Sequence, residues 1–233
     1  FGSLDNWISH ARTFAEHFTV YIVDQRNHGK SPHATEWDYF VMADDLRDFL
    51  DQQGIMQANL LGHSMGGKTV MQFAADYPER IKNLIVADMA PKTYNPHHTV
   101  ILEALIQMDL SVVNSRREAD QILARDISDP GVRQFLLKSL GRNAQKNFAW
   151  KFNLPVIYHN YSKVLANVQI DFPYEASTLF LYGGKSTYLV PEDYEMIQTK
   201  FPLAHFDVIQ KAGHWLHAEV PEEFQQKVLQ YLL

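Results

Sequence analysis

A serine lies at the centre of Gly62-His63-Ser64-Met65-Gly66, which matches the pattern G-x-S-x-G. An apolar run at residues 58–61 precedes it, and residues 68–75 have the composition of a helix. A strand, a sharp turn and a helix in this order present a serine hydroxyl as a nucleophile. The flanking glycines let strand and helix approach closely around a strained residue. The pattern also arises by chance in ordinary loops, but this context predicts that Ser64 is a nucleophile.

A serine hydroxyl needs a neighbouring general base to react at neutral pH. Of the eleven histidines, His214 is best placed, because it lies in Ala212-Gly213-His214-Trp215 after the last expected strand. Serine first and histidine last is one of the chain orders known for this chemistry. We expect His63, beside the nucleophile, to pack or hydrogen-bond inside the turn. His214, His217 and Glu219 also suggest a metal site, but one loop with a bulky Trp215 lacks the usual ligand spacing, and we expect no metal.

The imidazole in turn needs a carboxylate to fix its tautomer. The loop where that carboxylate is usually found reads Gly183-Gly184-Lys185-Ser186, with serine in place of an acid. Two alternatives remain: Asp88, at the end of an expected strand, and Glu192 or Asp193, at the start of a later helix. Negative charge in the first turn of a helix is common and explains the latter two without catalysis. We favour Asp88. A carboxylate at a strand end that is followed by Met89-Ala90-Pro91 is poorly explained as a surface charge that keeps the protein soluble.

Strands and helices alternate along most of the chain, which predicts an α/β fold with a mostly parallel sheet and helices on both faces. Ligands of such sheets bind beyond the carboxyl ends of the strands, where Asp24, Ser64 and Asp88 are expected. Besides the strand before Ser64, short buried strands are expected at residues 19–24, 81–88, 178–182 and 205–209.

The rhythm changes in residues 95–168, where helical patterns follow one another without strands. They cover residues 99–108, a stretch from Ser115 and residues 132–140. We therefore expect a helical cap at 95–168, inserted in a core of residues 1–94 and 169–233, whose apolar side chains roof an acyl pocket. Residues 1–6 read as the end of a loop entering a helix, so we also expect early strands of the core to precede the first residue.

Composition excludes several classes of protein. The 233 residues are 46% apolar and 21% charged, as in an ordinary globular protein. A formal net charge of −6 without a block of Lys or Arg argues against a nucleic-acid partner. The apolar runs are too short to span a membrane. The absence of cysteine excludes disulfides and thiol catalysis, and it fits a cytoplasmic protein while remaining compatible with the periplasm.

Taken together, these motifs resemble the α/β-hydrolase superfamily, and specifically the YbfF-type bacterial esterases. The matching segments run through the whole chain: Phe1-Gly2-Ser3-Leu4-Asp5-Asn6, Asp24-x-Arg26-Asn27-His28-Gly29-x-Ser31-Pro32, Gly62-His63-Ser64-Met65-Gly66-Gly67-Lys68, Asp88-x-Ala90-Pro91, Gln134-Phe135-Leu136-Leu137-Lys138-Ser139, Gly183-Gly184-x-Ser186-x-Tyr188 and Gly213-His214-Trp215-x-His217-Ala218-Glu219.

The resemblance implies a triad of Ser64, His214 and Asp88, and in this family a serine is expected at position 186. It also implies an oxyanion hole made of the Met65 N–H and a second donor just before Phe1. We expect Phe1, His63, Ser186 and Trp215 to contribute weakly to substrate binding, and no cofactor to be needed.

The expected function is a serine hydrolase acting on small-molecule carboxylic esters or on acyl thioesters such as acyl-CoA. A lyase or other non-hydrolytic enzyme on the same scaffold is one alternative, because a fold does not determine a reaction. A non-catalytic ligand-binding homologue is the other. The presence of both Ser64 and His214 disfavours a pure binder, which needs neither.

Overall fold

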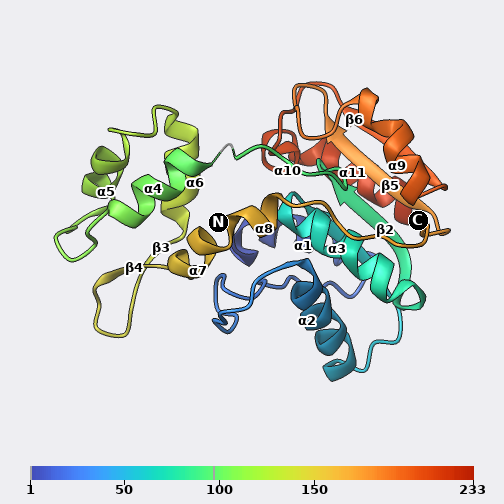
Figure 1. Ribbon diagram of the computed structural model, residues 1–233, viewed down its shortest axis with the longest axis horizontal. Coiled ribbons are helices and arrows are strands. Elements are labelled where there is room, and N and C mark those ends of the chain that lie inside the picture. Colours follow the sequence, from blue (N-terminus) through green and yellow to red (C-terminus); the bar gives the residue numbers. More distant parts are fainter. Residues whose placement is uncertain (1, 97) are drawn as a thin grey trace. The chain divides into compact units, whose positions relative to one another are not determined.

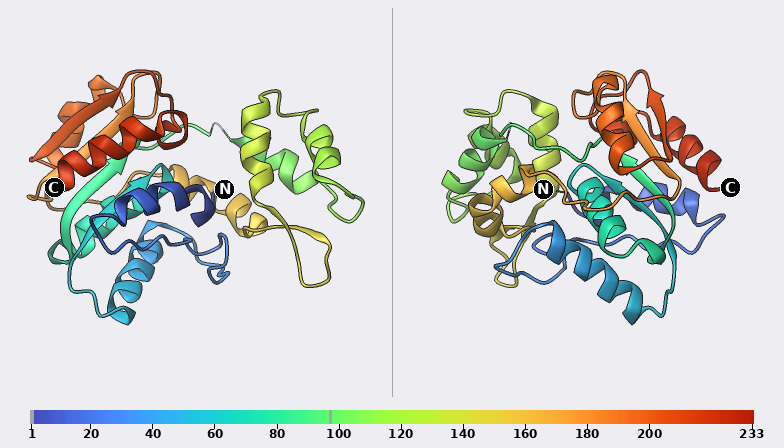
Figure 2. Two further views of the ribbon diagram at one scale, coloured as in Figure 1. Left: turned by 180° about the vertical axis from the view of Figure 1, so that it is seen from behind. Right: turned by 45° about the vertical axis from the view of Figure 1, so that its right-hand side comes forward.

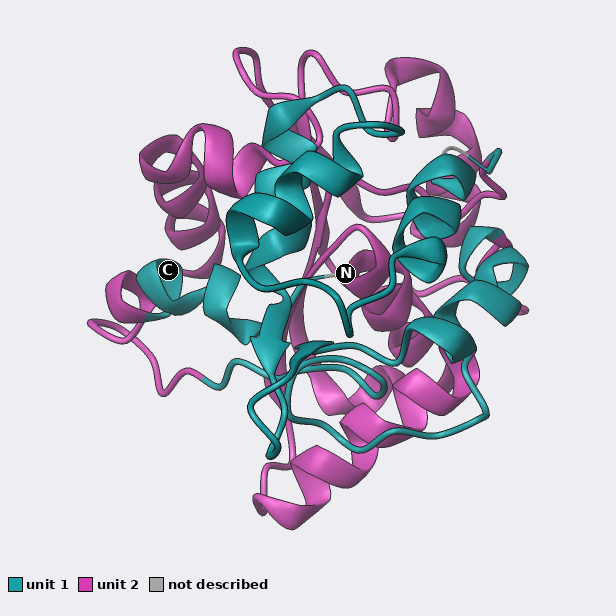
Figure 3. Cartoon of the chain, turned by 90° about the vertical axis from the view of Figure 1, so that its left-hand side faces the viewer, with its two compact units in different colours: residues 1–11, 21–37, 95–165 teal, residues 12–20, 38–94, 166–233 magenta. Residues whose placement is uncertain are grey.

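The computed structural model describes residues 2–96 and 98–233, and its internal contacts divide the chain into two compact units (Figure 3). Unit 2 comprises Arg12–Val20, Asp38–Tyr94 and Ala166–Leu233. Unit 1 comprises the chain up to Ala11, Tyr21–Trp37 and Asn95–Leu165. In this division the residues up to Ala11 and Tyr21–Trp37 group with the inserted segment, whereas the sequence prediction placed both in the core.

Unit 2 contains a four-stranded sheet of order β1-β2-β5-β6 in which all neighbours are parallel (Figure 1). The register pairs His63 with Ala87 and Gly183 with Ile209, so the carboxyl ends of neighbouring strands are level. This parallel sheet with its helices confirms the predicted fold class. The strands are β1 (Ala58–His63), β2 (Ile81–Ala87), β5 (Thr178–Gly183) and β6 (Ala204–Ile209).

The core of unit 2 lies where α3 packs on β1, β2 and α2. β2 and β5 are almost continuously buried, as expected for parallel strands covered on both faces. Phe73, Leu84 and Phe180 are fully buried, and each such side chain contributes about 1.5–3 kcal/mol of hydrophobic stabilisation. The helices of this unit are α2 (Tyr39–Gln52), α3 (Met65–Asp76), α9 (Tyr194–Lys200), α10 (Leu216–Glu219) and α11 (Pro221–Leu232), with 3-10 turns at Pro78–Arg80 and Pro191–Asp193.

Unit 1 is built from short helices and one antiparallel hairpin (Figure 2). The helix that begins at Arg116 is capped by Ser115, whose Oγ accepts from the backbone N–H of Glu118 at 3.1 Å. The elements are a 3-10 turn (Leu4–Asn6), α4 (Thr99–Gln107), α5 (Arg116–Leu123), α6 (Pro130–Lys138), β3 (Leu140–Arg142), β4 (Phe148–Trp150), α7 (Leu154–His159) and α8 (Tyr161–Leu165), while α1 (Ile8–Phe14) crosses from unit 1 into unit 2. None of the helices in the described ranges has the length and apolarity needed to cross a bilayer.

Three sequence predictions are wrong in detail. Residues 19–24 form no strand, and Tyr21 and Val23 are 49% and 46% exposed rather than buried. No ladder to a neighbouring strand is present there within the described residues, and an apolar extended segment becomes a strand only when such pairing exists. The insertion also contains the hairpin β3–β4, which the purely helical prediction missed, and α6 ends at Lys138 rather than at residue 140.

Candidate active site

Ser64 lies at the sharp turn between β1 and α3, with a backbone φ of 55°. This positive φ is uncommon for a residue with a side chain and costs conformational energy. The turn closes so tightly that a Cβ at position 62 would collide with the carbonyl group of Gly66. A backbone hydrogen bond of 3.1 Å from Ser64 N to Ala87 O fixes the turn to the end of β2. The local structure therefore places the hydroxyl at the carboxyl edge of the sheet, as the sequence predicted.

His214 lies in the loop between β6 and α10, and its imidazole reaches Ser64. Its Nε2 is 3.0 Å from Ser64 Oγ, and its Nδ1 is 2.6 Å from Asp88 Oδ2. The carboxylate of Glu219 accepts from the N–H of Gly213 at 2.8 Å and from that of Trp215 at 3.2 Å. One carboxylate thus holds the backbone on both sides of His214, which explains how a loop residue is fixed in position.

Asp88 follows β2, has a φ of 48° and is completely buried. Its Oδ1 accepts from Gly183 N at 3.0 Å, and its Oδ2 accepts from Ser186 Oγ at 2.5 Å. Because the carboxylate accepts these bonds, the proton between Asp88 and His214 belongs to Nδ1. Nε2 is then left to accept the hydroxyl proton of Ser64. Ser186 therefore supports the carboxylate, although the sequence assigned it only a weak role in binding substrate.

The alternative acids lie elsewhere. Asp193 accepts from Lys92 Nζ, at 2.7 and 2.6 Å to its two oxygens, and from Val190 N at 3.1 Å. Glu192 is exposed at the start of a 3-10 turn. The contact to His214 is made by Asp88, so the geometry favours Asp88 over both.

His63 lies beside His214 and is partly buried, with the two ring centroids 4.8 Å apart. Its Nε2 lies 2.7 Å from the carbonyl oxygen of His214, and because a carbonyl can only accept, this nitrogen is the donor. Burial first, then the nearby His217 and His214, lower the pKa of His63 well below its usual value. His63 is consequently a neutral structural neighbour of the reactive imidazole.

Three further residues were predicted to belong to the site: Met65, Trp215 and Phe1. Met65 is the first residue of α3, so its N–H belongs to the turn that carries Ser64. Trp215 follows His214 and binds Glu219 through its backbone. Phe1 lies outside the described residues. In the parts of the chain that are described, no three His, Asp or Glu side chains are grouped as a metal would require.

Two residues near the site escaped the sequence analysis as contributors. Tyr188 stacks on His214, with ring centroids 3.7 Å apart and planes 15° from parallel. Lys68 is 1% exposed, and its Nζ donates to Ala166 O at 2.5 Å and lies 4.7 Å from the centre of the Tyr94 ring. Burial lowers the pKa of Lys68 to about 7. Both residues belong to motifs that carried the family resemblance, and this was the available signal.

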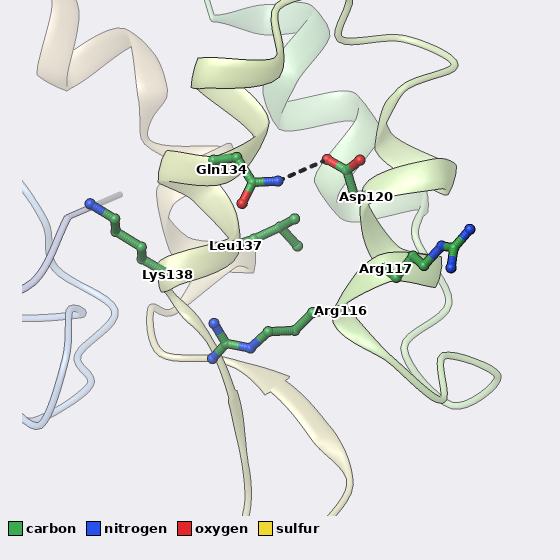
Figure 4. A pocket seen from close by; sticks show the side chains of 6 residues that line it. All are labelled: Arg116, Arg117, Asp120, Gln134, Leu137 and Lys138. Carbon is green, nitrogen blue, oxygen red and sulfur yellow. Dashed lines mark hydrogen bonds between the residues drawn. The ribbon is translucent and has the colours of Figure 1, made fainter.

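A hollow of about 370 Å³ in unit 1 is lined by charged residues but contains none of the predicted site residues (Figure 4). Asp120 in its wall is engaged by Arg133 at 2.9 Å, and Arg116 donates to Leu140 O at 2.7 Å. Arg117 and Lys138 also line the hollow, but their charged ends are directed outward (Figure 4). Volume alone therefore does not identify a reactive site here.

A serine, a histidine and a carboxylate linked in this way at the carboxyl edge of a parallel sheet are typical of α/β hydrolases. The model of the alpha/beta hydrolase fold family matches residues 1–221. The chain belongs to this family. Esterase YbfF of Escherichia coli is 37% identical over 233 residues, covering 100% of this chain and 89% of that protein, which confirms the resemblance to the YbfF-type esterases.

Other relatives include proteins named as a lipase and an esterase. The sn-1-specific diacylglycerol lipase ABHD11 of Mus musculus is 36% identical over 240 residues, covering 100% of this chain and 78% of the lipase. A solved structure described as a marine microorganism esterase superposes with a TM-score of 0.95 at 42% identity, covering 98% of this chain and 90% of that chain.

Proposed function

We propose that the protein is a serine hydrolase that cleaves carboxylic esters through an acyl-enzyme on Ser64. The observation that carries this proposal is the position of His214, which lies 3.0 Å from Ser64 Oγ and 2.6 Å from Asp88 Oδ2. The names of the relatives, esterase and lipase, support the same reaction.

In the first half-reaction, Ser64 Oγ attacks the acyl carbon while His214 Nε2 takes the hydroxyl proton. Asp88 stabilises the resulting imidazolium and keeps Nε2 directed at the serine. The Met65 N–H donates to the oxyanion of the tetrahedral intermediate. The intermediate collapses when the C–O bond to the leaving alcohol breaks and His214 returns the proton to that oxygen.

In the second half-reaction, water attacks the acyl carbon and gives its proton to His214. The bond to Ser64 Oγ then breaks, the proton returns to the serine, and the carboxylic acid leaves. Thioesters react at the same acyl carbon with a thiol as leaving group, so we include them as candidate substrates. The name of the murine relative makes diacylglycerol a further ester to test. These are small-molecule substrates, and we propose the cytoplasm as the site of action, with which a chain without cysteine is compatible.

The test is hydrolysis of p-nitrophenyl esters of increasing acyl length by the wild type and by Ser64→Ala. We expect the variant to lose about 10⁴- to 10⁶-fold in kcat, because removing the nucleophile leaves only residual stabilisation of the transition state. Equal rates for the two proteins would contradict the proposal. They would favour a non-hydrolytic enzyme or a binding protein on this scaffold.

A further inference from the structure

The ring of Tyr188 lies against one face of the His214 imidazole. The centroid separation of 3.7 Å and the interplanar angle of 15° describe two nearly parallel rings in direct contact. Aromatic pairs in proteins are usually separated by about 4.5–7 Å, so this pair is unusually close. Tyr188 therefore covers a surface of the imidazole that Ser64 and Asp88, which bind its two nitrogens, leave untouched.

The same loop positions Tyr188 and the carboxylate. The N–H of Tyr188 donates to Ser186 Oγ at 3.2 Å, and that hydroxyl in turn donates to Asp88. The carbonyl oxygen of Tyr188 accepts from the hydroxyl of Tyr94 at 2.7 Å. Burial raises the pKa of Tyr94, which keeps this hydroxyl protonated as a donor. Both backbone polar groups of Tyr188 are thus bound, and the backbone that carries its ring is fixed before substrate arrives.

An aromatic face attracts a cation, because the quadrupole of the ring is negative above its plane. During the reaction, the imidazole of His214 becomes positively charged when it takes the proton of Ser64 or of water. An attraction from Tyr188 is therefore stronger in the transition state than in the resting enzyme, which is the requirement for a catalytic effect.

Two carboxylates near the imidazole act in the same direction as Tyr188. Asp88 binds Nδ1, and Glu219 holds the adjoining backbone, so both carboxylates favour the same positive charge. His63 faces His214 as a tilted ring at 4.8 Å and stays neutral because burial lowers its pKa. His217 lies beyond it, 4.5 Å from the His63 ring. Two lysines lie over the Tyr94 ring. Lys68 Nζ is 4.7 Å from the ring centre, and burial lowers the pKa of Lys68 to about 7. Lys92 Nζ is 5.5 Å from the ring centre and is paired with Asp193 at 2.6 Å.

We propose that Tyr188 is a positioning residue whose aromatic face orients the His214 imidazole and stabilises its protonated form during acyl transfer. The inference rests on the proposed hydrolase function. It adds Tyr188 to the proposed mechanism as a second partner of the base His214, beside the carboxylate of Asp88.

The test replaces Tyr188 with phenylalanine and with phenylalanines carrying one, two and three ring fluorines. Fluorine weakens the negative face of the ring step by step and changes its shape little. We expect Tyr188→Phe to retain the acid-side midpoint of the pH profile of kcat/KM. Each added fluorine should lower that midpoint and kcat together, by about 0.4–1.5 pH units and 2- to 30-fold over the series, with KM little changed. A flat series would overturn the inference, because a purely steric contact does not depend on fluorine.

A second measurement tests the same inference without relying on enzyme activity. Protonation of His214 can be followed by NMR of its ring C–H in the Ser64→Ala background, with the same replacements at position 188. The midpoint should fall along the series there too, and equal midpoints would again refute the role of Tyr188. If Ser64→Ala hydrolyses esters as fast as the wild type, the proposed function itself fails. If hydrolysis depends on Ser64 and the series is flat, only the inference about Tyr188 fails.

Discussion

The hydrogen-bonded site in unit 2 and the hollow in unit 1 both gather charged side chains, but they use them in opposite ways. Asp88 is completely buried, and its oxygens accept from Gly183, Ser186 and His214. Arg117 and Lys138, at the hollow, are exposed, and their charged ends are directed outward. Burying a charge costs free energy unless hydrogen-bond partners are held around it. The burial of Asp88 among fixed partners is therefore typical of a catalytic site.

The first prediction compares two aspartates within unit 2. Asp88→Asn should lower kcat about 10⁴-fold. The amide oxygen stays on the N–H of Gly183, so the NH2 group donates to Nδ1 and His214 presents the wrong tautomer to Ser64. Asp193→Asn should change kcat only a few-fold, since Asp193 binds Lys92 and the N–H of Val190 rather than His214. Steady-state kinetics on one p-nitrophenyl ester measures both. Full activity in Asp88→Asn would refute its assignment as the acid.

The second prediction compares two lysines, one buried in unit 2 and one exposed in unit 1. With its pKa lowered to about 7 in the folded protein against a usual 10.5, Lys68 binds a proton more readily in the unfolded chain. The unfolding free energy should therefore rise with pH between about 7 and 10, and Lys68→Met should remove that rise. Lys138→Met is the matched control and should leave the slope unchanged. Urea titrations at several pH values measure how the unfolding free energy changes with pH. Equal pH slopes for the wild type and Lys68→Met would contradict the account.

The smallest effect is expected at the hollow. Arg117→Gln and Lys138→Gln should each leave ester hydrolysis within about two-fold of the wild type, because single exposed charges contribute little. A ten-fold loss in either variant would show that the hollow takes part in the reaction, and the contrast between the two regions would then fail.

From the sequence, the positions of the candidate catalytic residues were easier to predict than the contacts that support them. Ser64 and His214 were predictable because the turn pattern and the position after the last strand depend on local residue order. Asp88 was predictable as a polar residue ending an apolar strand. The bond from Ser186 to Asp88 and the stack of Tyr188 on His214 depend on how residues 184–190 fold back over the site, which no periodicity encodes.

The same distinction holds for the fold. β2 and β5 are long apolar runs with one stable environment, the interior of a parallel sheet. Residues 19–24 have the composition of such a strand, but forming one requires a neighbouring strand, and composition cannot specify that. β3 and β4 have three residues each, too few for an alternating pattern to be recognised.

The central claim is that Ser64 is the activated nucleophile, and covalent labelling with a fluorophosphonate tests it most directly. Mass spectrometry should find one label on the peptide containing Ser64, with no labelling of Ser64→Ala and much slower labelling of His214→Ala. A label on another residue, or undiminished labelling of Ser64→Ala, would contradict the account.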